Sequence, residues 1–250
     1  MTYAETELTL PDVREDRFLP SALLREVAAS ARPHRLSFPD GHRGWLVSDY
    51  ATARAVLADR RFIIGVSRQP RGTPGKLDAF HAALGPLAAG AITSKDPPEH
   101  TRLRRAVGDR FSAVSVEGRA ESIEGIVRGQ LAALESAGRP ADLLRVFARP
   151  IPCRVICDVL GVPQSDQDQF IGPTDLILSP SGTPDDVTRA FAEFSEYVRG
   201  VVAAKRAHRG DDLLSDLVHG TNLSADEICG LALELVVTGH ETTAEHAAAV

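Results

Sequence analysis

Hydrophobic residues recur every three or four positions through most of the chain, and this spacing predicts a mainly α-helical protein. The pattern is longest over residues 223–250, where Ile228, Leu231 and Leu235 fall on one side of a helix. Ser224 and Glu227 stand three positions apart at the beginning of this run, in the capping-box pattern that often opens a helix. A long helix is therefore expected to begin immediately after Ser224.

Shorter helices and one small sheet are predicted along the rest of the chain. The expected helices cover residues 20–33, 50–58, 150–160, 167–178, 185–209 and 211–219, with Ser21 and Asp49 as the N-caps of the first two. Segments 35–38 and 45–48 flank Pro39-Asp40-Gly41 and are typical of a β-hairpin. Residues 65–94 are rich in Gly and Pro and should form a loop with one short helix at 77–84. Because composition does not change along the chain, residues 1–250 are expected to form a single domain.

Composition and charge narrow the possible functions. The sequence is 43% hydrophobic and 25% charged, which is ordinary for a folded globular protein, and its net charge of -6 argues against general nucleic-acid binding. No apolar run reaches the roughly 18 residues of a membrane span, and the first twelve residues lack a signal-peptide pattern. A cytoplasmic protein is expected, with neither nucleic acid nor membrane as a partner. Cys153 and Cys157 lie in an apolar helical stretch and are expected to be buried thiols.

The stretch 96–105 has the sequence Asp-Pro-Pro-Glu-His-Thr-Arg-Leu-Arg-Arg. Asp96 is the expected N-cap of a helix, and Glu99 would complete a capping box. His100 and Arg104 then lie four positions apart on one helix face, where they present hydrogen-bond donors for carboxylate groups. A solvated basic face is the plainer interpretation of the same two residues. The remaining basic residues of this region would attract an acidic partner, and they are Arg102, Arg105 and Arg110.

The strongest sign of chemistry is the hexapeptide 238–243, Thr-Gly-His-Glu-Thr-Thr, inside the long helix. Gly239, Glu241 and Thr242 have lower helix propensity than the Ala and Leu around them, or bond the backbone instead, so packing alone would not favour them. A glycine lets a flat group approach the backbone, and an acid can pass protons. An unremarkable helix is the plain alternative. A zinc site of the His-Glu-x-x-His type is excluded, because Ala244 stands where the second histidine is needed.

The hexapeptide closely resembles the oxygen-activating segment in the central helix of cytochromes P450, with Thr238 as the one departure from the family pattern. The stretch 96–105 resembles the P450 helix whose His and Arg bind the haem propionates. The order of hairpin, helix and Arg-Phe over residues 35–62 also resembles the N-terminal part of a soluble bacterial P450. The resemblance covers the whole chain and implies the P450 fold, a helical domain with a small N-terminal β-sheet. The C-terminal part of that fold, with the Cys loop that holds the iron, is missing from this sequence.

By this resemblance, the chain is the N-terminal part of a haem-thiolate monooxygenase that inserts one atom of O2 into a small organic substrate. Thr242 would stabilise the oxygen that is being activated and its proton-delivering water, while Glu241 would relay protons. Haem would be held at four positions, which are His100, Arg104, Gly239 and Thr243. None of the three cysteines has the sequence context of the iron ligand, so the chain by itself is expected to be inactive.

The remaining predictions concern the substrate and the partners. Glu234 and Thr238 precede Thr242 by two turns and one turn of helix, and we expect both near the substrate. A carboxylate there suits an amine or a polyol, although pairing with a neighbouring arginine is the plainer interpretation. The family implies electrons from NAD(P)H through a ferredoxin-type protein. The alternative is a P450-like protein without thiolate-bound haem that serves another enzyme as partner or activator, but the intact acid and alcohol of the hexapeptide favour the enzyme.

Overall fold

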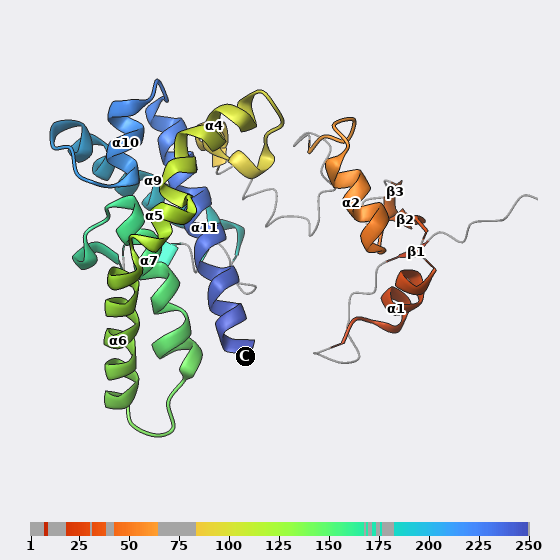
Figure 1. Ribbon diagram of the computed structural model, residues 1–250, viewed down its shortest axis with the longest axis horizontal. Helices are drawn as coiled ribbons and strands as arrows, with labels where there is room; N and C mark the ends of the chain where they lie inside the picture. The colour runs from red at the N-terminus through yellow and green to blue at the C-terminus, as the bar shows by residue number, and fades with distance from the viewer. Residues whose placement is uncertain are drawn as a thin grey trace, which may run out of the picture. The chain divides into compact units, whose positions relative to one another are not determined.

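The computed structural model describes residues 8–9, 19–30, 32–38, 43–64, 84–167, 169, 172–173, 176 and 183–249, and the side chains of residues 241, 245 and 247–249 lie outside this part. The chain divides into two units, residues 1–74 and residues 75–250. Its described elements are mostly helices with one small sheet, which confirms the predicted mainly α class (Figure 1). The single domain expected for residues 1–250 concerns how the two units sit together, and it stays a prediction.

The first unit contains the small sheet. Strands β2 (His34–Ser37) and β3 (Arg43–Leu46) pair antiparallel, so the predicted hairpin is confirmed with its strands shifted by one or two residues. Strand β1 (Leu8–Thr9) pairs parallel with β2 and was not predicted, because two residues show no alternation. The flanking helices are α1 (Ala22–Ala29) and α2 (Tyr50–Ala58). Their expected N-caps are confirmed, since the side chains of Ser21 and Asp49 accept backbone N–H bonds.

The second unit is helical in all its described elements. Its α-helices are α4 (Glu99–Gly108), α5 (Ala113–Glu117), α6 (Ala120–Ser136), α7 (Pro150–Leu160), α9 (Pro184–Ala207), α10 (Leu213–Gly220) and α11 (Ala225–Ala249). Short 3-10 or π turns connect them: η2 (Gly85–Gly90), η3 (Ile92–Ser94), η4 (Asp109–Phe111), η5 (Leu144–Ala148) and η6 (Gln164–Asp166). Helices α5 and α6 and the turn η5 lie in residues 111–149, for which no element was predicted.

Helix α11 organises the second unit. It packs most extensively against η2 and α7, and also against α9 and η5. Its buried residues Ile228, Leu231 and Val236 join α9 residues such as Phe191 and Phe194 in one hydrophobic core. Figure 1 shows α11 as the long blue helix that ends at the label C. The helix predicted over residues 223–250 is therefore a central element of the packing.

Most boundaries predicted for the later helices are confirmed within three residues. Helix α7 ends at Leu160 as predicted, and the next residue, Gly161, adopts the left-handed conformation that glycine reaches without strain. Helix α9 begins one residue earlier than predicted, because Thr183 and Asp186 form a capping box. The loop predicted at 179–184 lies outside the described residues up to position 182, and so does much of the helix predicted at 167–178.

Two expectations about the segment before α4 are wrong. Residues 84–94 were assigned to a loop, but they form η2 and η3 and pack on α11; the short helix expected at 77–84 lies outside the described residues except for Leu84. The expected N-cap at Asp96 is also wrong, because α4 begins at Glu99 and its cap residue is Pro98. A residue before proline is disfavoured in the helical conformation, and two prolines in succession therefore delay the start of the helix.

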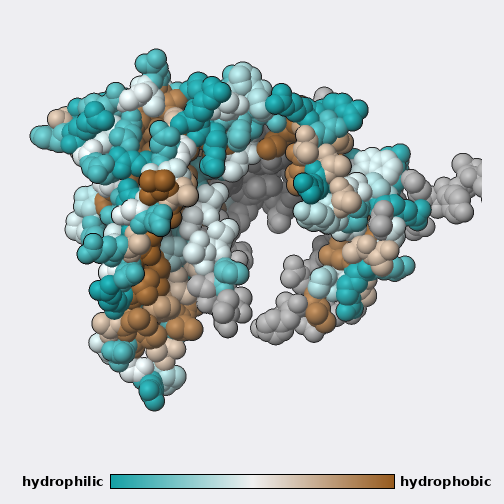
Figure 2. Space-filling view, in the orientation of Figure 1, coloured by the Kyte–Doolittle hydropathy of each residue, from teal (hydrophilic) through white to brown (hydrophobic). Residues whose placement is uncertain are grey.

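Apolar side chains remain exposed on one part of the second unit. Figure 2 shows a hydrophobic band on the side where α6 and α7 lie in Figure 1. Leu131 of α6 is 45% exposed, and Leu143 beside η5 is 50% exposed. No helix within the described ranges is both long and apolar enough to cross a membrane.

Candidate functional site

The start of α11 is fixed by side chains of two helices. The backbone N–H of Ser224 donates to the Glu227 carboxylate at 2.8 Å, and the N–H of Glu227 donates to the Ser224 hydroxyl at 3.2 Å. The predicted capping box is therefore confirmed. Arg102 of α4 forms an ion pair with the same Glu227 carboxylate. One acid thus caps α11 and ties it to α4.

A chain of hydroxyl-to-carbonyl bonds follows the exposed side of α11. The hydroxyl of Thr242 donates to the carbonyl oxygen of Thr238 at 2.7 Å, and the hydroxyl of Thr238 donates to that of Glu234 at 2.7 Å. Both threonines are exposed, whereas Glu234 is half-buried. These three residues follow one another at intervals of four, so they line one side of the helix as the sequence predicts. A hydroxyl bonded to the carbonyl four residues earlier competes with the backbone ladder there.

The opposite side of α11 faces the core. Val236, His240 and Ala244 are buried, and His240 is only 1% exposed. The two ring nitrogens of His240 have no hydrogen-bond partner among the described residues. The hexapeptide is thus divided between two environments, with the imidazole of His240 inside and the hydroxyls of Thr238 and Thr242 on the exposed side.

The other predicted residues of the hexapeptide lie between these two sides. Gly239 faces α7, and a Cβ added to it would meet Ile156 at 3.8 Å, an ordinary contact. Thr243 is exposed. The side chain of Glu241 lies outside the described residues, although its backbone belongs to α11. Their assignments to haem and to proton relay therefore stay predictions.

Thr93 is a site residue that the sequence analysis missed. Its hydroxyl donates a hydrogen bond to the Glu234 carboxylate, which brings η3 onto the exposed side of α11. No described Arg, Lys or His side chain forms an ion pair with Glu234, so among these residues the pairing with a neighbouring arginine is not found. No local pattern around Thr93 indicates this contact, because the residue falls in a stretch that was expected to be a loop.

Two glycines hold η2 against α11. A Cβ on Gly90 would lie 2.1 Å from the carbonyl oxygen of Glu227, and a Cβ on Gly230 would lie 2.1 Å from that of Leu87. No side chain fits between the two backbones at this point. The contact lies one turn before Glu234, so it sets the position from which Thr93 reaches the carboxylate. A glycine inside a predicted helix was the available signal for this close approach.

His100 and Arg104 lie on α4 as predicted. His100 is half-buried and Arg104 is exposed. Neither side chain forms a hydrogen bond or ion pair with any residue of the described part of the chain. Their donors are consequently available for an anionic group.

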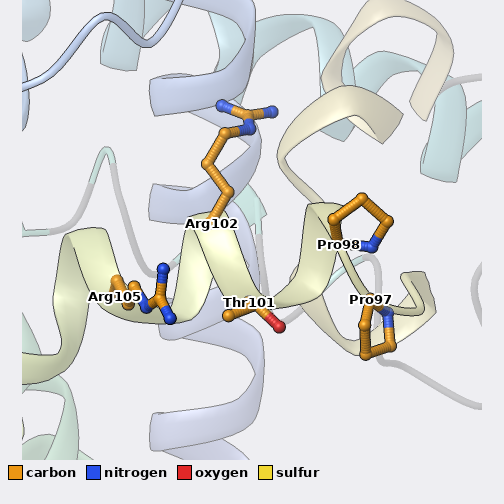
Figure 3. Close-up of a pocket in the computed structure, with 5 residues that line it drawn as sticks. All are labelled: Pro97, Pro98, Thr101, Arg102 and Arg105. Atoms are coloured by element: carbon orange, nitrogen blue, oxygen red, sulfur yellow. The ribbon is translucent and has the colours of Figure 1, made fainter.

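The other arginines of this region differ in their pairing. Arg110 of η4 bonds Asp216 at 2.6 Å and Asp211 at 2.7 Å, and Arg102 is paired with Glu227, so these two charges are offset. Arg105 has no such partner among the described residues. A pocket of about 620 Å³ opens at the start of α4, and Figure 3 shows the residues that line it, which are Pro97, Pro98, Thr101, Arg102 and Arg105. Arg105 is therefore the available cation of the predicted basic patch.

The three cysteines lie in the core. Cys153, Cys157 and Cys229 are all buried with no exposed surface, which confirms the buried thiols predicted for the first two. Burial raises the pKa of the Cys229 thiol to about 11. The thiolate, which is the form that binds metals, is disfavoured there.

Comparison with known proteins identifies close relatives. No protein-family model matches the chain. The chain is 38% identical over 239 residues to the cytochrome P450 monooxygenase PikC of Streptomyces venezuelae, an alignment that covers 93% of this chain and 54% of the relative. It is 36% identical over 217 residues to the mycinamicin IV hydroxylase/epoxidase of Micromonospora griseorubida, covering 84% of this chain and 52% of the relative.

Solved structures of hydroxylases superpose on this chain. The mycinamicin VIII methyl hydroxylase MycCI of Micromonospora griseorubida superposes with a TM-score of 0.81 at 32% identity, covering 95% of this chain and 60% of that one. The cytochrome P450 hydroxylase LnmA of Streptomyces atroolivaceus also has a TM-score of 0.81 at 32% identity. The chain spans about half the length of the curated relatives it matches.

Proposed function

We propose, from the homology of this chain to the N-terminal part of bacterial cytochromes P450, that the whole protein is a haem-thiolate monooxygenase. It would insert one atom of O2 into a small organic substrate. The observation that carries the proposal is the exposed side of α11, where the family's acid and alcohol positions are intact and the Thr242 hydroxyl bonds the carbonyl of Thr238. Because the chain spans about half of its relatives, the activity is that of the whole protein, and this chain alone would be inactive.

The residues present fit a haem group. His100 and Arg104 offer donors that no described residue uses, and such donors suit the two propionates. Gly239 and Thr243 are proposed to contact the haem from α11. The cysteines of this chain are buried. The thiolate ligand would therefore come from the part of the whole protein that corresponds to the C-terminal half of its relatives. When bound, haem supplies the oxidising chemistry that side chains lack.

Thr242 and Glu241 are the proposed catalytic residues. The hydroxyl hydrogen of Thr242 is engaged with the carbonyl of Thr238, so its oxygen lone pairs can accept a hydrogen bond from a water molecule. That water would be held where a proton is needed. Glu241, as a carboxyl group next to it in sequence, would exchange protons with solvent.

The proposed substrate contacts lie on α11, and the proposed contact with the redox partner lies on α4. Glu234 and Thr238 are the proposed substrate contacts, because they share one side of α11 with Thr242. Electrons would come from NAD(P)H through a ferredoxin-type protein. Arg105 is the cation of α4 that remains available, and it would attract an acidic partner of this kind. The proposed location is the cytoplasm, where NAD(P)H is present.

Spectroscopy of the whole protein tests the proposed function. The protein should purify with about one haem per chain, and the reduced protein should give a thiolate-type Soret band in the carbon monoxide difference spectrum. A whole protein that binds no haem would contradict the proposal and would favour the alternative, a P450-like partner or activator of another enzyme. A carbon monoxide complex without thiolate character would also contradict it.

A further inference from the structure

The exposed side of α11 presents hydrogen-bond acceptors without donors between Glu234 and Thr242. Carbonyl and carboxylate oxygens can only accept, so every hydroxyl bonded to one of them is the donor of that bond. The hydroxyl hydrogens of Thr238 and Thr242 are directed to the carbonyls four residues earlier, each at 2.7 Å. The hydroxyl hydrogen of Thr93 is directed to the Glu234 carboxylate. These oxygen atoms can therefore offer a ligand only their lone pairs.

The Glu234 carboxylate is the charged end of this surface. One of its oxygens accepts the bond from Thr93, and the other has no partner among the described residues. Thr93 is a neutral group, and no cation in the described part of the chain forms an ion pair with Glu234. A half-buried carboxylate with one neutral donor retains most of its capacity to attract a cation, and partial burial strengthens that attraction relative to bulk water.

The spacing of Glu234 and Thr242 in the sequence sets the distance between them along the helix. Eight residues separate Glu234 from Thr242, which corresponds to about 12 Å along the axis of an α-helix. Thr238 lies between them and presents an acceptor oxygen. A ligand along this side would therefore meet a negative charge at one end and the proposed catalytic hydroxyl at the other.

We propose that this surface selects a cationic organic substrate, in which a protonated amine binds Glu234 about 12 Å from the position that Thr242 serves. An ammonium group supplies the charge and donors that the acceptor-only surface lacks. The inference rests on the proposed function, because it takes Thr242 as the reacting end. Glu234 is the residue that determines specificity, and Thr93 is a positioning residue that holds its carboxylate.

A matched pair of ligands tests the charge recognition. Benzyltrimethylammonium and neopentylbenzene have the same shape and differ by the charge on one central atom. The quaternary ammonium has neither a lone pair with which to bind iron nor an N–H donor, so its affinity reports on attraction between its charge and the protein surface. Calorimetric titration of the whole protein should give at least about tenfold tighter binding of the cation. The Glu234→Gln variant should lose this preference while its affinity for the neutral ligand stays within about twofold.

Two control variants separate this site from general attraction by a protein of net charge -6. Glu121→Gln removes the same charge from an exposed position of α6 and should keep the preference. Thr93→Val removes the bond that holds the carboxylate, so it should weaken the preference for the cation without abolishing it, and it tests the site if Glu234→Gln does not fold. Equal affinity of the wild-type protein for the two ligands would overturn the inference, and so would an undiminished preference in folded Glu234→Gln. Haem content is measured on the same samples, so that failure of the proposed function is recognised separately by missing haem.

Discussion

The backbones of Gly90 and Gly230 meet without a side chain between them, and a Cβ on either glycine would lie 2.8 Å from the Cα of the other. This contact fixes η2 on α11 one turn before Glu234, and η3 follows it directly in the chain. The hydroxyl of Thr93 in η3 then reaches the Glu234 carboxylate. Two residues without side chains thus position the part of the proposed site that lies nearest to the start of α11.

Substitution of Gly230 by Ala should destabilise the protein. The added methyl would meet the Leu87 carbonyl at 2.1 Å, and because that atom belongs to the backbone, a segment must move. We expect a loss of about 1–3 kcal/mol in the free energy of unfolding, measured by urea denaturation. Gly129→Ala is the control, since a Cβ at this exposed position of α6 meets nothing within 4 Å. It should stabilise the protein by about 0.5–1 kcal/mol. Equal stability of the two variants would show that η2 does not pack on α11 in this way.

Sequence reasoning recovered the features that have a local signal. The capping box of Ser224 and Glu227 fixed the start of α11, and Gly161 fixed the end of α7, because caps act within one turn. The spacing of four between Thr238 and Thr242 also placed them correctly on one side. These features depend on neighbours in the chain and can be read directly.

The contacts that depend on distant residues were not recovered. Thr93 lies 141 positions from Glu234, and no periodicity in a Gly- and Pro-rich stretch indicates which residue it meets. The expected cap at Asp96 failed because two successive prolines outweighed a good capping residue. The burial of His240 beside exposed hydroxyls follows from packing against other helices, which the sequence of α11 alone does not specify.

The Arg102–Glu227 pair predicts a pH-dependent contribution to stability. Burial acts to raise the pKa of the Glu227 carboxyl, but bonds from Ser224 and Arg102 outweigh it and hold the pKa below the ordinary 4.5. A lowered carboxyl pKa stabilises the folded protein above 4.5, and this contribution is lost as the pH falls from 4.5 through the folded-state pKa.

Glu227→Gln keeps the length and capping oxygen of the side chain but removes its charge. At pH 7 we expect a loss of about 0.5–1 kcal/mol, a small value because Arg102 is half exposed. The difference from wild type, measured by urea denaturation at several pH values, should be constant from about pH 7 to pH 5 and shrink below that. A difference that grows as the pH falls would contradict the assignment. Glu121→Gln supplies the baseline for removing an exposed charge.

Removal of His100 and Arg104 should weaken haem retention by the whole protein. Each propionate would lose a charge-assisted donor, which is worth about 1.5–3 kcal/mol. The measurement is haem content after repeated desalting of the His100→Ala/Arg104→Ala double variant. Arg105→Ala removes a charge from the same helix and should retain haem like the wild type. If the double variant keeps its haem as well as Arg105→Ala does, the two residues do not hold the propionates.

The exposed leucines near α6 should limit the solubility of residues 1–250 expressed alone. Contiguous apolar surface promotes association, and Leu131 and Leu143 are each about half exposed. Leu131→Glu/Leu143→Glu should raise the soluble yield and reduce light scattering. The free energy of unfolding should change by no more than about 0.5 kcal/mol per site, as is usual for surface positions. Scattering that persists at the wild-type level would place the cause of association elsewhere.

The Thr242 hydroxyl lies on the exposed side of α11 and donates its hydrogen to the carbonyl of Thr238. Its proposed role in oxygen activation is the central claim. In the whole protein, loss of this hydroxyl would remove the acceptor that we propose for the proton-delivering water. Reducing equivalents would then be released as hydrogen peroxide, while the fold and haem content stay unchanged. Thr242→Ser keeps a hydroxyl on the same carbon and is the matched control.

The most direct measurement is the ratio of hydrogen peroxide to oxygenated product per NADH consumed by the wild type, Thr242→Ala and Thr242→Ser. We predict that Thr242→Ala consumes NADH at a comparable rate but converts most of it to peroxide, whereas Thr242→Ser stays close to the wild-type ratio. A Thr242→Ala protein that couples NADH to product as well as the wild type would contradict the claim that this side of α11 serves oxygen activation.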